Sequence, residues 1–69
     1  MSKLYALAMS ASYQDGEYVA IDTLAAVVFA KSQDEAVEAA YDYVVRERPP
    51  SDGWRNYGAA VFEIPEEML

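Results

Sequence analysis

The sequence predicts an α+β domain, in which a small antiparallel sheet of three to four strands carries one main helix on one face. Two apolar runs, Leu4–Ser12 and Ala59–Ile64, alternate with the two-residue period of a strand. Between them, residues 32–48 carry a helix start, apolar residues at helical spacing and a proline stop. Packing one helix on one sheet buries the apolar sides of both, in the order β-β-(β)-α-β.

The first strand is expected at Leu4–Ser12, followed by a hairpin turn. One face of this strand would carry Tyr5, Leu7, Met9 and Ala11. The next residues, Gln14–Glu17, contain Asp-Gly between two apolar runs, which is a strong signal for a tight hairpin.

Two interpretations of residues 17–30 remain open from the sequence. In the first, Glu17–Asp22 is a second strand, Asp22–Leu24 is a tight connection, and Ala25–Ala30 is a third strand. In the second, the whole stretch is one long bent strand. Both place Val27 and Phe29 on one face and Val28 on the other.

The helix is predicted to begin at a capping box formed by Ser32–Glu35. In this motif the Ser32 hydroxyl accepts a hydrogen bond from the Glu35 amide, and the Glu35 side chain reaches back to the backbone amide of Ser32. Pro49-Pro50 ends the helix, because proline lacks the amide donor. The expected buried stripe consists of Ala36, Val37, Ala40, Tyr41 and Val44.

After the helix, Trp54–Gly58 is expected to be a loop or the approach to the last strand, Ala59–Ile64. Ala60, Phe62 and Ile64 would share one face of that strand. If Leu4–Ser12 or Ala59–Ile64 lies at a sheet edge, its free backbone groups could pair with a second copy, so we expect a monomer or a weak dimer.

Length and composition indicate one domain spanning residues 1–69. Hydrophobic residues make up 54% of the chain, which is enough for a core and argues against intrinsic disorder. The chain has no Cys and no His, so disulfides and the usual zinc ligand sets are excluded.

The same absences argue against an enzyme. Histidine is the commonest general base and cysteine the strongest nucleophile, and the three glycines are too scattered to form a phosphate-binding loop. We therefore expect no catalytic residue, no metal and no cofactor.

The charge balance points to a protein partner. Twelve acidic residues face five basic ones, for a net charge of −7. Such a chain is repelled by nucleic acids and anionic membranes but attracted to basic protein surfaces, including those that hold DNA or RNA. No targeting or membrane-spanning segment is apparent, so we expect a cytoplasmic location.

The helix concentrates these acids. Asp34, Glu38 and Asp42 recur every four residues and so form a row with steps of about 6 Å. Glu35 borders the row, and Arg46 continues it and can pair with Asp42. One interpretation is an ordinary solvated outer face; the other is a partner-binding row that imitates a nucleic-acid backbone. Further candidate binding acids are Asp15 and Glu17 in the hairpin turn.

Aromatic side chains beside these acids are candidate anchors for a partner. Tyrosine and tryptophan add contact area at low entropic cost. The candidates are Tyr43, Trp54 and Tyr57, whereas Tyr41 is expected in the core. The alternative for Trp54 is that it caps the open end of a small core.

In length, acidity, lack of Cys and His, and expected arrangement of strands and helix, the whole chain resembles the type I-C anti-CRISPR proteins encoded by phages. This resemblance rests on whole-chain character and carries over no individual residue. It implies a ferredoxin-like fold, or a truncated variant, in a protein that acts in the cytoplasm of the infected bacterium. It also implies that the acidic surface binds the large subunit of the Cascade effector, at the basic site that reads the PAM and receives duplex DNA.

Residues 4–45 also resemble the partial domain of HicB-type antitoxins. The similarity rests on the hairpin segment Tyr13–Ala20 and the capped, alanine-rich segment Ser32–Ala40, in that order. Residues 22–26 lack the Pro and Gly that this family places after the second strand. The resemblance implies a small regulatory module that binds one protein partner.

Overall fold

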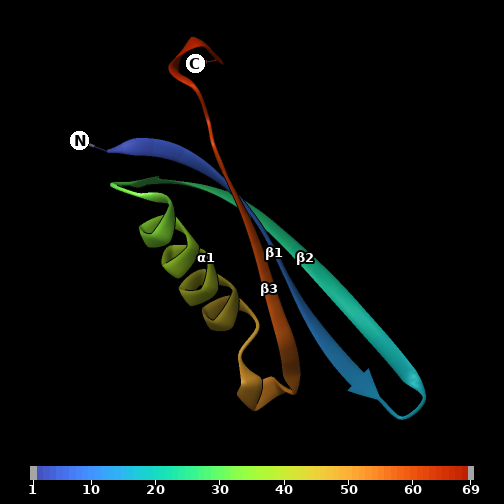
Figure 1. Ribbon diagram of the computed structural model, residues 1–69. Coiled ribbons are helices and arrows are strands. Elements are labelled where there is room, and N and C mark those ends of the chain that lie inside the picture. Colours follow the sequence, from blue (N-terminus) through green and yellow to red (C-terminus); the bar gives the residue numbers. More distant parts are fainter. Residues whose placement is uncertain (1, 69) are drawn as a thin grey trace.

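A computed structural model describes residues 2–68 as a three-stranded antiparallel sheet with one helix packed on it (Figure 1). The elements are β1 (Lys3–Asp15), β2 (Tyr18–Ala30), α1 (Gln33–Glu47), the short 3₁₀ turn η1 (Pro50–Asp52), β3 (Trp54–Glu63) and a second 3₁₀ turn η2 (Glu66–Met68). The α+β class and the order β-β-α-β are those predicted from the sequence. The molecule is elongated, with principal extents of 47 × 19 × 14 Å.

The strand order β2-β1-β3 places the N-terminal strand in the middle of the sheet. Because β2 and β3 both run antiparallel to β1, they are parallel to each other, and α1 connects them in a split βαβ unit. The expectation of a free edge at Leu4–Ser12 is therefore wrong, since this strand is paired on both sides. Ala59–Ile64 does belong to an edge strand.

Residues 18–30 form one continuous strand, which decides between the two interpretations of this stretch. Asp22 pairs with Ala11 and Thr23 pairs with Ser10, so the pairing with β1 runs unbroken through the proposed connection. At the other end Asp15 pairs with Tyr18, and Gly16 adopts a φ of 62°, a conformation that favours glycine. The predicted Asp-Gly hairpin is confirmed.

The start and end of α1 follow their sequence signals. The Ser32 hydroxyl accepts a hydrogen bond from the Glu35 amide at 3.2 Å, as the capping box predicts. The Glu35 carboxylate, however, accepts from the amide of Lys31 at 3.3 Å, one residue before the expected donor. The helix ends at Glu47, and the Arg48 amide closes it by donating to the Val44 carbonyl.

The core lies between α1 and one face of the sheet. The buried side chains are Tyr5, Leu7, Met9, Ala11, Ala30, Ala36, Ala40 and Val44. Of the two faces that the strand period assigns to β1, the one with Tyr5, Leu7, Met9 and Ala11 is buried. Tyr41, which was expected in the core, is 40% exposed and is not a core residue. At about 100° per residue, Tyr41 lies about 100° around the helix from Ala40, while Tyr43 lies only about 60° away and packs against the core instead.

Strand β3 begins five residues earlier than the predicted Ala59. The register with β1 shifts between Ser10 and Ser12, which pair with Gly58 and Arg55 respectively. This shift is a bulge, and Asn56 within it has a φ of 53°. Because of this bulge, Trp54–Gly58 pairs with β1, although the aromatic and glycine residues of this segment suggested a loop.

Candidate binding surface on the helix

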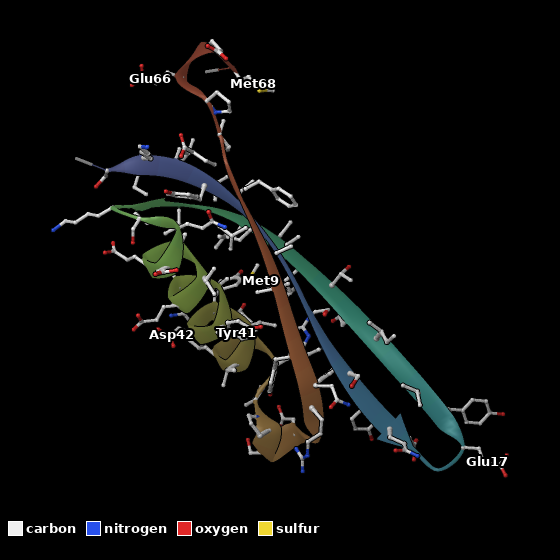
Figure 2. The ribbon with its side chains drawn as sticks, in the orientation of Figure 1. Met9, Glu17, Tyr41, Asp42, Glu66 and Met68 are labelled. Carbon is white, nitrogen blue, oxygen red and sulfur yellow. The ribbon has the colours of Figure 1, made fainter. Side chains whose placement is uncertain are left out.

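The outer face of α1 carries the predicted acidic row. Asp34, Glu38 and Asp42 are all exposed, and so is Glu35 beside them. Glu38 and Asp42 lie about 160° around the helix from buried Ala40, so they point away from the sheet. Figure 2 shows Asp42 on the side of α1 that faces solvent.

The charges of this row have no compensating partner among residues 2–68. The ion pairs found there join Lys3 to Glu63 and Arg48 to Asp22, and neither includes an acid of the row. Arg46 does not form the expected pair with Asp42; its guanidinium lies over the ring of Tyr43, 5.4 Å from the centroid. The row is therefore a continuous negative stripe.

The hairpin acids lie away from this stripe. Asp15 ends β1 and Glu17 occupies the turn, and both are exposed. Figure 2 shows Glu17 at the tip of the β1–β2 hairpin, beyond the end of the sheet that α1 covers. The structure thus splits the predicted binding acids into a helix group and a hairpin-tip group.

The three candidate anchors are half-buried and contact other parts of the chain. Trp54 packs on Tyr13, with ring centroids 5.7 Å apart, and the Arg48 guanidinium lies 5.7 Å from its ring. The Tyr57 hydroxyl donates to the Arg48 carbonyl at 2.5 Å, and Tyr43 lies beneath Arg46. Capping the open end of the core is the role that these contacts give Trp54.

Sequence reasoning missed a polar cluster at the end of α1. Arg48, the residue that caps the helix, pairs with Asp22 of β2 across 26 residues of sequence. No local pattern marks this pair, because it depends on how the helix is laid across the sheet.

No arrangement suited to a metal was found in the part of the chain that the structure describes, since no three of its acidic residues gather around one point. Among residues 2–68 there is also no helix with the length and apolar character that a membrane crossing requires.

Comparison with models of known protein families, with curated proteins and with solved structures found no match to this chain.

Proposed function

We propose that this chain binds a basic, DNA-receiving protein surface through the outer face of α1 and thereby keeps DNA from that surface. In this proposal the partner is the large subunit of a type I-C Cascade effector, and the outcome is inhibition of target recognition. The observation that carries the proposal is the exposed stripe of Asp34, Glu35, Glu38 and Asp42, none of which forms an ion pair with a basic side chain of residues 2–68.

The charge density of the stripe supports imitation of DNA. Residues 34–42 span about 12 Å of helix axis, so the four acids provide one negative charge per about 4 Å of axis. One strand of duplex DNA carries one phosphate charge per about 3.4 Å of the duplex axis. A basic groove that follows a DNA strand would therefore meet a similar linear charge on this helix.

The stripe also has the stiffness that such a role needs. It lies on a fifteen-residue helix whose opposite side is anchored in the core by Ala36, Ala40 and Val44. Since these residues are on a packed helix, the spacing of their backbone positions is fixed before binding. Pre-organisation of this kind lowers the entropic cost of association.

A direct test mixes the purified protein with purified type I-C Cascade and measures binding of a PAM-containing duplex. The proposal predicts that the protein co-elutes with Cascade and that the duplex no longer binds. Co-elution without loss of DNA binding would exclude the blocking mechanism. Absence of any complex would exclude Cascade as the partner.

A second candidate function is that of a HicB-like regulatory module. The observation that favours it is the hairpin of β1 and β2 followed directly by a capped helix, the arrangement on which that resemblance rests. Its test is co-expression with a small basic toxin encoded by a neighbouring gene. Relief of toxicity would support this candidate, and unchanged toxicity would contradict it.

A further inference from the structure

The face of the sheet opposite α1 is apolar and uncovered. In the part of the chain that the structure describes, Figure 1 shows α1 on one side of the sheet and no helix on the reverse side. The strand register assigns alternate residues to this open face. Its five large, exposed side chains are Val19 (63% exposed), Ile21 (71%), Val27 (61%), Phe29 (71%) and Phe62 (61%).

Within the paired strands of residues 2–68, the register places no acid on the open face. Glu63 and Glu66 line a hollow beside Leu4 and Phe29 at one end of it. Within the paired strands, its residues include Ala6, Ala8 and Ser10 of β1 and Thr23 and Ala25 of β2. The charged residue that the register places there is Arg55, opposite Ser12. Its guanidinium donates to the carbonyls of Pro50 and Trp54, so it is held at the edge.

The relief of this face is uneven. Its centre is a shallow hollow of about 570 Å³, because the side chains around it are small: Ala8, Ser10, Thr23, Ala25, Gly58 and Ala60. Towards one end stand Val27, Phe29 and Phe62, with Phe62 and Val27 paired to Ala6 from either side.

We propose that a second copy of this chain covers the open face, so that the two sheets pack face to face in a symmetric dimer. This inference does not depend on the proposed function, because it uses the opposite side of the molecule. In the dimer each acidic helix remains on the outside. The apolar layer between the sheets becomes a second core.

The size of the face suits such an interface. The thirteen-residue strands β1 and β2 are about 43 Å long, the ten-residue β3 is about 33 Å long, and each strand is about 4.8 Å wide. The two copies therefore bring together an area of about 1,100 Å², just above the about 1,000 Å² that a specific interface should exceed. The core under α1 needs this support, because four of its eight buried residues are alanine and the chain has no cysteine for a disulfide.

Electrostatics favours a second copy over a charged partner on this face. Within the paired strands of residues 2–68, a basic protein or a nucleic acid would find no acid on this face, and the one cation there, Arg55, is held by backbone carbonyls. In a face-to-face dimer the acidic rows of the two copies are separated by two sheets and two helices, about 30 Å, with layers about 10 Å thick. This separation exceeds the Debye length of about 8 Å at physiological ionic strength, so their repulsion is screened.

The oligomeric state tests the proposal. In sedimentation equilibrium at about 100 μM protein, the wild type is expected to approach twice the monomer mass of 7.7 kDa. Phe29→Lys should weaken association about tenfold or more, because it places a charge in the apolar layer of each copy. Tyr18→Lys is the matched control: it lies on the same strand and is 81% exposed, but on the other face.

A second measurement uses only wild-type protein, so the misfolding of a variant cannot affect it. In a mixture of isotope-labelled and unlabelled chains, intermolecular NOEs are expected from the methyl groups of Val27 and Ile21 to aromatic protons of Phe62 and Phe29. A monomer at all concentrations overturns the proposal and leaves the face to a different partner. A dimer whose NOEs arise only from the edges of β2 or β3 overturns it as well.

Discussion

The guanidinium of Arg48 lies 2.7 Å from the carboxylate of Asp22, at both Nε and Nη2, and joins the end of α1 to the middle of β2. The same guanidinium lies over the ring of Trp54, 5.7 Å from its centroid, and the Arg48 carbonyl accepts a hydrogen bond from the Tyr57 hydroxyl. One residue thus connects the helix, β2 and β3. This cluster seals the end of the core, where the chain turns from α1 towards β3.

Breaking this pair should lower the free energy of unfolding. We expect a double-mutant cycle of Asp22→Ala and Arg48→Ala to give a coupling of about 1 kcal/mol, because the pair is charged and hydrogen-bonded but part-exposed. The coupling energy is obtained from urea denaturation of the wild type, the two single variants and the double variant.

The exposed Lys3–Glu63 pair, at 3.5 Å, is the matched control. Its cycle should give a coupling close to zero. Equal coupling energies in the two cycles would contradict the conclusion that the Arg48–Asp22 pair stabilises the fold more than an exposed ion pair does.

The Tyr57 hydroxyl gives an independent test of the same cluster. Tyr57→Phe removes the donor to the Arg48 carbonyl while keeping the ring in the core. The expected loss is about 1 kcal/mol of unfolding free energy in urea denaturation. Tyr41→Phe, on the exposed outer part of α1, should change stability by less than about 0.5 kcal/mol.

The two glycines with positive φ should respond differently to alanine. At Gly53, with φ of 96°, an added Cβ would lie 2.9 Å from the ring of Tyr13, so strain and a steric clash act together. At Gly16, with φ of 62°, an added Cβ meets nothing within 4 Å. Thermal unfolding should show that Gly53→Ala lowers the melting temperature clearly more than Gly16→Ala; the reverse order would contradict the structure of the η1–β3 corner.

Elements with a local signal were predicted well from the sequence. The division of β1 into two faces follows from the two-residue period of a strand, and the start of α1 follows from Ser32 and Glu35, whose contact involves only neighbours. The Asp-Gly hairpin likewise needs no distant partner. In each case the residues that determine the structure are within a few positions of one another.

Features set by tertiary packing were not predictable in this way. The central place of β1, the bulge that extends β3 back to Trp54 and the Arg48–Asp22 pair all depend on how α1 crosses the sheet. Tyr41 was expected in the core because it fits a broad apolar stripe, but the contact with the sheet is centred on Ala40 and leaves it outside. The acidic row was predictable because its position depends on helical spacing alone.

Complex formation through the acidic row should be sensitive to salt. The Debye length falls from about 10 Å at 0.1 M to about 3 Å at 1 M, so exposed carboxylates lose their long-range attraction. We expect the association rate with Cascade, measured by surface plasmon resonance, to fall steeply over this range. A rate that does not change with salt would point to an apolar contact instead.

The central claim is that the outer face of α1 is the surface that displaces DNA, and one competition experiment tests it most directly. It compares the wild type with the triple variant Asp34→Lys, Glu38→Lys, Asp42→Lys and the control Asp52→Lys, Glu66→Lys, Glu67→Lys. Both variants raise the net charge by six units, from −7 to −1, and the control residues are exposed and lie in η1 and η2. Circular dichroism establishes that each variant is folded.

The readout is the concentration of each protein that halves binding of a PAM-containing duplex to type I-C Cascade. The account predicts that the helix variant needs about 30-fold more protein, a loss of about 2 kcal/mol, while the control stays within a few-fold of wild type. Equal losses in the two variants would show that only net charge matters, and unchanged inhibition by the helix variant would show that α1 is not the binding face.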